Sequence, residues 1–307
     1  MIRSFTVTNT LGDSIKIDLA EPEKSGFVIV SVTGLGPAKA NIVTSEISTN
    51  DGALFNSARL NSRNIVFNLL FWDTNSGESI EEIRLKSYRF FAPKKKLTLL
   101  VETDKRTAEI VGYVETNEPT IFSKSEGAQI SIICPDPYFY SAGKDGTMRT
   151  VFSGDDPLFE FPFSNESLTE NLLVFGEVQL KTSNVVYYPG DADTGIVIQL
   201  HAVGPIEGIS IYNTKTKAVM KLDTDKLAAI VGSAIQKGDD IVINTKRGEK
   251  SVTFVRSGAK TNVLNCLDRN SDWLYLVKGD NVFAFAAVKN VENLQVVIEN
   301  QVLFEGV

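Results

Sequence analysis

The sequence predicts a mainly β protein with two domains, the first a β-sandwich or barrel carrying one packed α-helix and the second a β-sandwich. Three observations support this prediction. Runs of β-branched and aromatic residues, bounded by Gly, Pro, Asn and Asp, recur along the whole chain. One segment of the first half has clear helical periodicity. Two prolines one residue apart, Pro135 and Pro137, interrupt the strand pattern near the middle of the 307 residues.

Five strands are expected in the first half of the chain, because each apolar run there is bounded by residues that favour turns, such as those of 50–52 and 116–119. A half of this length is large enough to bury its own core. The expected strands cover residues 27–32, 64–71, 97–102, 109–115 and 129–134.

The helix of the first half is predicted from its capping residues and its apolar face. Ser79 and Glu82 have capping-box spacing, in which each side chain accepts a hydrogen bond from the other residue's backbone amide. Ile83 and Phe90 follow at helical spacing and define the face that packs on the sheet. Pro93 then ends the helix.

The second half is almost entirely β by its pattern, with strands at roughly ten-residue spacing, which favours a two-sheet sandwich or jelly roll. Phe159, Phe161 and Phe163 alternate and predict one buried sheet face. Residues 226–235 suggest a short helix. The expected strands cover residues 176–180, 185–188, 195–201, 206–212, 218–222, 240–244, 251–255, 273–277, 282–286, 294–298 and 302–304.

The proline pair marks the expected domain boundary. Proline cannot donate a ladder hydrogen bond, so a strand must end near Cys134. The prolines also favour extended backbone before them, and the aromatic residues 138–140 need apolar cover, so the exit from the strand should be stiff. We therefore expect domains at residues 1–140 and 141–307. The rigid inter-domain junction is expected at Cys134, Pro135, Asp136, Pro137, Tyr138 and Phe139.

Composition excludes several classes of protein. The formal net charge is −7 and there is no basic stripe, which disfavours sequence-specific nucleic-acid binding. Cys134 and Cys266 are far apart and form no C-x-x-C pair, so neither a disulfide framework nor a zinc site is indicated. No apolar run approaches the roughly 20 residues that span a membrane, and we expect neither a membrane anchor nor a signal peptide.

No combination of residues predicts catalysis, a metal site or a cofactor. His201 is the one histidine of the chain and has no G-x-S-x-G motif or second histidine near it. The pair Asp191 and Asp193 follows Pro-Gly and is more simply a turn than a calcium site. Aromatic residues could form a sugar-stacking platform on a sandwich face, although Trp273 in particular is expected in the core. The candidates are Trp72, Trp273, Tyr187 and Tyr188.

Motifs in both halves resemble, in their order and spacing, the distal tail protein (Dit) family of long-tailed, non-contractile bacteriophages, the siphophages. Cys134-Pro-Asp-Pro137-Tyr-Phe is the most specific of these motifs. The others include Val32-Thr-Gly34-Leu-Gly36, Arg63-Asn-Ile-Val-Phe, Tyr88-Arg-Phe-Phe-Ala-Pro93, Tyr188-Pro-Gly-Asp191, Gly238-Asp-Asp-Ile-Val-Ile-Asn-Thr245, Trp273-Leu-Tyr-Leu and Lys278-Gly-Asp-Asn281.

This resemblance implies a structural, non-enzymatic virion protein at the distal end of the viral tail, synthesised in the cytoplasm of the bacterial host. Its first domain would be tail-tube-like and would assemble into a hexameric hub ring, through whose lumen DNA passes. Its second domain would be a galectin-like sandwich. The partners implied are the tail tube protein, the tail-associated tip protein of the baseplate and receptor-binding proteins for host attachment. A carbohydrate-binding module or adhesin, and a hydrolase with carboxylates on the sandwich, are the alternatives.

Overall fold

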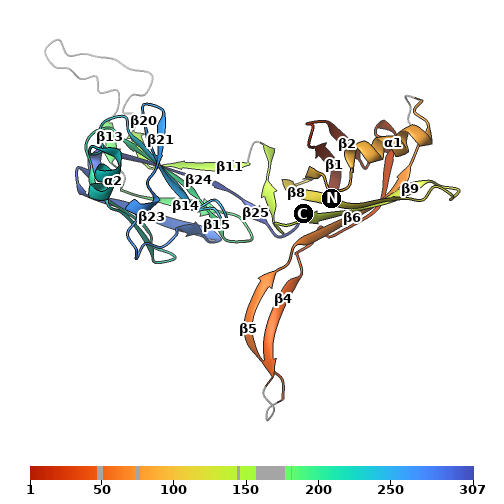
Figure 1. Ribbon diagram of the computed structural model, residues 1–307, viewed down its shortest axis with the longest axis horizontal. Helices are drawn as coiled ribbons and strands as arrows, with labels where there is room; N and C mark the ends of the chain where they lie inside the picture. Colours follow the sequence, from red (N-terminus) through yellow and green to blue (C-terminus); the bar gives the residue numbers. More distant parts are fainter. Residues whose placement is uncertain (47–50, 74–76, 144–145, 157–176, 181) are drawn as a thin grey trace, which may run out of the picture. The chain divides into compact units, whose positions relative to one another are not determined.

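The computed structural model describes residues 1–46, 51–73, 77–143, 146–156, 177–180 and 182–307. It divides the chain into two compact units (Figure 1). The first comprises Met1–Gly146 with Leu303–Val307, and the second comprises Thr147–Val302. The predicted alternating residues Phe159, Phe161 and Phe163 lie outside the described residues.

The unit boundaries differ from the predicted division into residues 1–140 and 141–307. The expected last strand, 302–304, is not part of the second unit's sheets. Instead β25 (Leu303–Phe304) pairs with β10 (Phe139–Ser141) in the first unit. Residues 141–146 also belong to the first unit. Pairing between segments so far apart in the chain leaves no trace in local sequence pattern.

The first unit is built on one antiparallel sheet whose strand order is β2-β1-β7-β8-β9-β6-β3, with β10 joining β8 to β25. The strand path is open from β2 to β3 and does not close into a barrel. Its remaining strands are β1 (Ile2–Asn9), β2 (Ser14–Asp18), β3 (Phe27–Thr33), β6 (Arg63–Phe71), β7 (Lys96–Thr103), β8 (Thr107–Pro119) and β9 (Gly127–Cys134), with a short 3₁₀ turn η1 (Pro22–Lys24) between β2 and β3.

Helix α1 (Ile80–Phe90) packs on this sheet and confirms the predicted capping box. The Ser79 hydroxyl accepts from the Glu82 amide and the Glu82 carboxylate accepts from the Ser79 amide. Ile83 and Phe90 are buried on the face that meets the sheet. The core beneath includes Phe5 and Phe67, whose rings meet edge to face at 5.2 Å.

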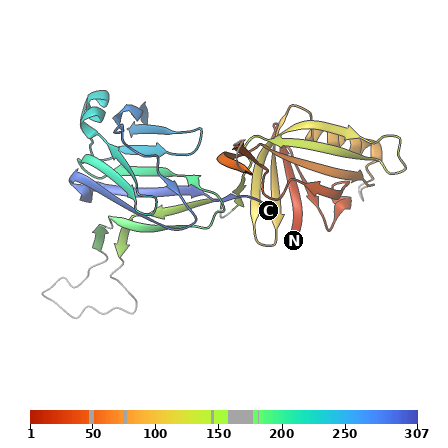
Figure 2. The same ribbon diagram turned by 90° about the horizontal axis from the view of Figure 1, so that it is seen from below.

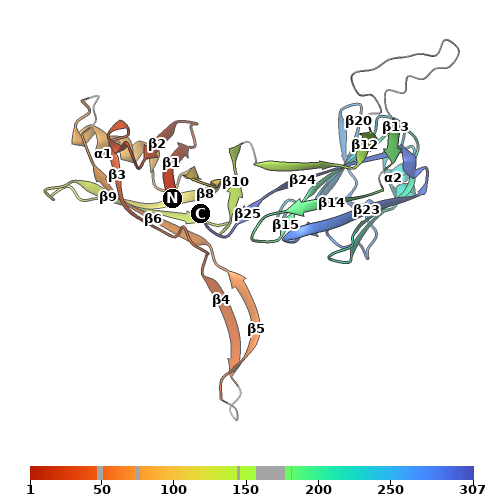
Figure 3. The same ribbon diagram turned by 180° about the vertical axis from the view of Figure 1, so that it is seen from behind.

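A two-stranded ribbon extends from the first unit, formed by β4 (Ala40–Glu46) and β5 (Ala53–Leu60) (Figure 3). Among the described strands, these two pair only with each other. Every described residue of the ribbon except Leu60 is exposed. We call residues 40–46 and 53–60 the hairpin arm. The strand pattern of the sequence did not predict it.

The second unit contains the predicted sandwich (Figure 2). A six-stranded sheet has the order β11-β24-β16-β19-β20-β21 and a four-stranded sheet the order β14-β23-β17-β18. The six strands are β11 (Thr147–Val151), β16 (Val197–Ala202), β19 (Asp240–Asn244), β20 (Ser251–Arg256), β21 (Ala259–Asn262) and β24 (Leu294–Gln301). The four strands are β14 (Ser183–Tyr188), β17 (Glu207–Asn213), β18 (Ala218–Leu222) and β23 (Gly279–Lys289).

Alternating apolar residues of the two sheets fill the core of the second unit, where Phe152 and Phe285 meet edge to face at 5.9 Å. The short helix begins at Thr224 rather than at the expected residue 226, because the Asp223 carboxylate accepts from two amides of its first turn. The smaller elements of the second unit are β12 (Ser153–Asp156) paired with β13 (Glu177–Leu180), β15 (Thr194–Gly195) paired with β22 (Tyr275–Leu276), α2 (Thr224–Val231), η3 (Leu264–Cys266) and η4 (Val291–Asn293).

Within the described residues, neither helix is long and apolar enough to cross a bilayer.

Candidate functional site: an arginine anchor and a hairpin arm

The six predicted junction residues form a connected bend inside the first unit. Strand β9 ends at Cys134, which is fully buried, and Pro135 and Asp136 follow it exposed. The Asp136 carboxylate accepts from the Tyr138 amide at 3.2 Å and from the Tyr140 hydroxyl at 2.5 Å. Pro137 and Tyr138 are half-buried and Phe139 is fully buried in β10. That this bend sets an inter-domain geometry stays a prediction.

Arg63 is the centre of the bend, although the sequence did not single it out beyond its motif. Its side chain is buried, and its guanidinium donates to backbone carbonyls of three separate segments. The acceptors are the carbonyls of Pro137 at 2.7 Å, Gly34 at 2.6 Å, Glu305 at 2.6 Å, and Gly36. The same group lies over the Phe139 ring, 4.6 Å from its centre. We call Arg63 with these partners the arginine anchor.

In the arginine anchor, the buried positive charge of Arg63 is stabilised mainly by hydrogen bonds to backbone carbonyls. Burial lowers the pKa of Arg63, while the nearby Cys134 and Glu305 side chains oppose this shift. A guanidinium stays protonated in proteins, so the cation must be satisfied where it lies. Its planar fork of donors suits several acceptors at once, which a lysine ammonium cannot reproduce.

Glycines allow the backbone segments to approach closely at the anchor. Gly34 has a φ of +85°, and a Cβ there would lie 2.0 Å from the carbonyl oxygen of Asn64. A Cβ on Gly306 would lie 2.8 Å from the carbonyl oxygen of Leu35. The Val307 amide donates to the same Leu35 carbonyl at 3.1 Å. The last residues of the chain are thus packed tightly against the segment that leads into the hairpin arm.

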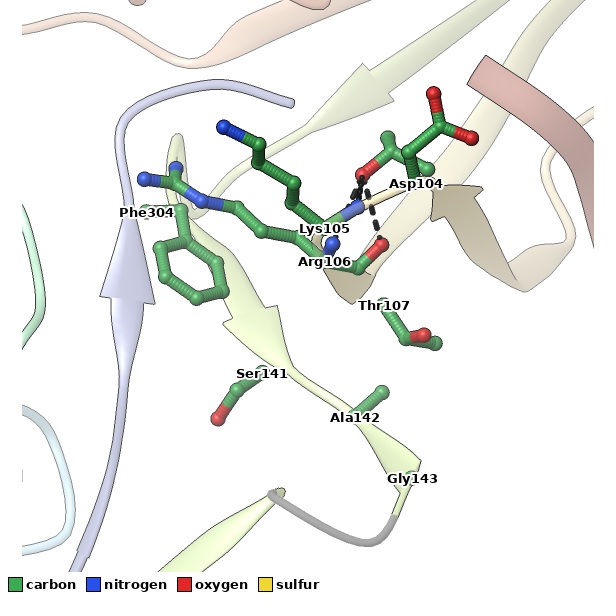
Figure 4. Close-up of a pocket in the computed structure, with 9 residues that line it drawn as sticks. Asp104, Lys105, Arg106, Thr107, Ser141, Ala142, Gly143 and Phe304 are labelled. Atoms are coloured by element: carbon green, nitrogen blue, oxygen red, sulfur yellow. Dashed lines mark hydrogen bonds between the residues drawn. The ribbon is translucent and has the colours of Figure 1, made fainter. Parts of the chain in front are cut away.

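A polar cavity of about 450 Å³ lies next to this region, around the turn between β7 and β8 (Figure 4). Lys105 and Arg106 extend along one side of it, and the Arg106 guanidinium lies 4.5 Å from the centre of the Phe304 ring. Asp104 also lines it, but its carboxylate is engaged by the Met1 ammonium and by Arg3. The cavity is basic and rich in hydroxyl groups, and the described residues that line it do not include the convergent acid and base groups that hydrolysis needs.

The two faces of the hairpin arm differ in polarity. Residues directly opposite each other share a face, so Ile42 pairs with Ala58 on one face and Val43 with Ser57 on the other. A register shift follows Val43 and places Phe55 opposite Thr44, on the face of Ile42. The apolar face carries Ala40, Ile42, Thr44, Glu46, Ala53, Phe55, Ala58 and Leu60, whereas the opposite face carries Asn41, Val43, Ser45, Leu54, Ser57 and Arg59.

This apolar face is open to solvent in the single chain. Ile42 is 60% exposed and Phe55 is 66% exposed. An isolated two-stranded hairpin is at best marginally stable in water, so the arm needs cover to hold a fixed shape. The arm is therefore not part of the unit's core.

The aromatic residues considered for a sugar platform do not all lie on one exposed face of the second unit. Tyr188 is buried and its hydroxyl donates to the Ala192 carbonyl, whereas Tyr187 is exposed on the opposite face of the same strand. Trp72 belongs to the other unit. Trp273, expected in the core, is half-buried with the Lys250 ammonium 4.9 Å from its ring centre. The core position next to it is taken by Leu274, since neighbouring residues of an extended chain point to opposite sides.

His201 and Asp240 pair across β16 and β19, with 2.6 Å between His201 Nδ1 and Asp240 Oδ1, and both side chains are half exposed. Among the described residues, no three His, Cys, Asp or Glu side chains gather in a way that could hold a metal ion. In the turn of Asp191 and Asp193, the Asp191 carboxylate forms an ion pair with the Lys278 ammonium, which lies 3.1 Å away.

Comparisons with known proteins agree with this architecture. Residues 189–297 match the family model of the siphovirus-type tail component, C-terminal domain. No curated protein shows significant sequence similarity to the chain. The crystal structure of SPP1 Dit, described as a paradigm of the hub adsorption apparatus in phages that infect Gram-positive bacteria, is 12% identical to the chain. The match covers 98% of this chain and 99% of that one, with a TM-score of 0.63.

The phage P2 baseplate in its activated conformation is also 12% identical over 98% of both chains, with a TM-score of 0.45. The likeness to SPP1 Dit shows a shared fold along nearly the whole chain, and the family match supports a structural role in a phage tail. The predicted resemblance to the siphophage distal tail protein family is confirmed: the chain carries the C-terminal domain of a siphovirus-type tail component on the fold of a Dit protein.

Proposed function

We propose that this protein is a non-enzymatic hub of a siphophage tail that closes into a homohexameric ring. The observation that carries the proposal is the exposed apolar face of the hairpin arm, which presents Ile42 and Phe55 to solvent. Large exposed apolar side chains gathered on one face mark an interaction site in a soluble protein.

The occupant proposed for this face is a second copy of the same chain. In this proposal the arm, which lies outside the core of its own unit, docks on a different surface of the neighbouring copy. An interface between two different patches is heterologous, and it generates a closed ring when the rotation between copies closes. Burying an exposed Ile or Phe side chain contributes about 1.5–3 kcal/mol, so each contact of the ring gains from both residues.

In the virion this ring would join the last ring of the tail tube to the tip protein and to receptor-binding proteins at the distal end of the tail. DNA would pass through its lumen without sequence-specific contacts. The net charge of −7 fits this passage, since an overall negative charge disfavours non-specific binding of DNA. The family match and the fold of SPP1 Dit support this assignment.

Mass photometry of the purified chain tests the proposal. We expect a species of six times the chain mass, lost in the double variant Ile42→Ser/Phe55→Ser. The matched control is Val43→Ser/Leu54→Ser, which removes exposed apolar side chains from the opposite face of the same arm. A chain that stays monomeric at micromolar concentration, alone and with its tube protein, would contradict the proposal. Equal loss of the hexamer in both double variants would show that the apolar face has no special role.

A further inference from the structure

The arginine anchor joins two segments that the proposed function does not connect. Gly34 and Gly36, whose carbonyls accept from Arg63, lie just before the hairpin arm. Glu305, whose carbonyl accepts from the same guanidinium, belongs to the last five residues of the chain. We call residues 303–307 the C-terminal segment. The Arg63 side chain is therefore hydrogen-bonded both to the base of the arm and to the C-terminal segment.

The C-terminal segment is held in the first unit by a short strand and by contacts of its individual residues. Its strand β25 has two residues, paired with Phe139 and Tyr140. Its other contacts include the Phe304 ring under Arg106, the Glu305 carbonyl on Arg63 and the Val307 amide on Leu35, and the side chains of Leu303 and Phe304 are buried. A strand of two residues can open locally while the rest of the unit stays folded. The segment can therefore exchange between a bound and a released state.

Release of the segment would also change the arm base. The guanidinium would lose the Glu305 acceptor, and water would reach a buried cation whose remaining partners include Gly34 and Gly36. Gly306 packs directly on the Leu35 carbonyl, so the support beneath this loop would be removed as well. The arm begins only a few residues later, at Ala40.

We propose that the C-terminal segment is a latch that fixes the base of the hairpin arm through Arg63. Binding of the latch and docking of the arm are then linked, and the linkage is reciprocal: an arm held by a second copy tightens the latch. This regulation rests on the proposed function, because it is the docking of the arm that it controls. The coupling between latch and arm base exists in the single chain and can be measured there.

Amide hydrogen exchange by NMR on the full-length monomer tests the coupling. The Ile42→Ser/Phe55→Ser variant provides a monomeric background if the chain assembles at NMR concentrations. The Asn61 amide, which donates to the Lys39 carbonyl at 3.1 Å, reports on the arm base, and the Val307 amide reports on the latch. Phe304→Ala loosens the latch without altering a residue of the arm base. The matched control is Phe122→Ala, because Phe122 is fully exposed in the same unit.

Phe304→Ala should speed exchange of the Asn61 amide by roughly fivefold or more, the lower end of typical coupling between sites. Phe122→Ala should leave it unchanged. In an Arg63→Lys background, adding Phe304→Ala should have little further effect on Asn61, because the connecting side chain is already gone. The proposal is overturned if Phe304→Ala affects Val307 alone, or if its effect on Asn61 persists undiminished in the Arg63→Lys background. Failure to form rings would contradict the proposed function and leave this monomer result intact.

Discussion

The guanidinium of Arg63 lies 4.6 Å from the centre of the Phe139 ring and donates to the carbonyl of Pro137, two residues before that ring. The motif residues Arg63 and Phe139, which are far apart in the chain, thus form a single contact. The cation stacks on the aromatic face while its N–H groups satisfy carbonyls of the surrounding loops. The strength of this contact is the first property that can be measured.

Replacing Arg63 by alanine should destabilise the first unit by about 3 kcal/mol or more, because the hydrogen bonds of its buried side chain to carbonyls of three segments and its contact with the Phe139 ring would all be lost. Urea unfolding followed by tryptophan fluorescence, with both variants in a Trp273→Phe background, would report the change through Trp72, which lies in this unit. Arg59→Ala, on the exposed hairpin arm, should stay within about 0.5 kcal/mol of the parent. Equal stabilities of the two variants would show that the anchor contributes nothing to folding.

Gly34→Ala should lower the melting temperature, since Gly34 has a φ of +85° and a Cβ there would lie 2.0 Å from the Asn64 carbonyl oxygen. The left-handed conformation alone costs a non-glycine residue about 1–2 kcal/mol, and the clash adds to it. Gly36→Ala is the matched control, because a Cβ at Gly36 meets nothing within 4 Å. Calorimetry giving the same melting temperature for both variants would be inconsistent with this geometry.

The second unit should lose stability in acid through Asp239. Burial raises the pKa of Asp239, but hydrogen bonds from the Arg256 side chain and the Gln236 amide outweigh burial and hold the pKa below its ordinary value of 3.8. A lowered pKa in the folded state stabilises the fold above pH 3.8, and this contribution is lost as the pH falls through the folded-state pKa. The Asp239→Asn variant should therefore be less stable than the parent at neutral pH. As the pH falls below about 4, it should lose less stability than the parent does. A parallel pH profile for the variant would contradict this role.

The Cys134 thiol should resist alkylation in the folded protein. Burial raises its pKa to about 11, so little thiolate is present at pH 8 and no reagent reaches it. Mass spectrometry after iodoacetamide treatment should find Cys134 unmodified until urea unfolds the first unit. Ser57→Cys on the exposed arm provides the positive control for the reagent. Modification of Cys134 at the same rate as that control would show that the end of β9 opens readily.

The features that sequence predicted best have local causes. Ser79 and Glu82 form the expected capping box, and the helix ends three residues before Pro93. Strand β9 ends at Cys134, where the first proline follows. Capping and proline geometry act within a few residues, so their signals survive in the sequence without knowledge of the fold.

The candidate site was mostly hidden because its contacts are distant in the chain. Arg63 was visible only as part of a motif, since its acceptors are backbone carbonyls, which carry no residue signature. The return of Leu303 and Phe304 to the first unit depends on pairing with β10. The hairpin arm escaped notice because a solvent-exposed ribbon lacks the strong apolar runs of core strands, and its one apolar face depends on the register shift beside Val43.

Electron microscopy of the purified full-length protein tests the central claim most directly. The account predicts class averages of a closed ring with six-fold symmetry, and predicts that the Ile42→Ser/Phe55→Ser variant yields single particles of one chain. Wild-type images showing only separate chains, or rings that survive loss of the arm's apolar face unchanged, would contradict it.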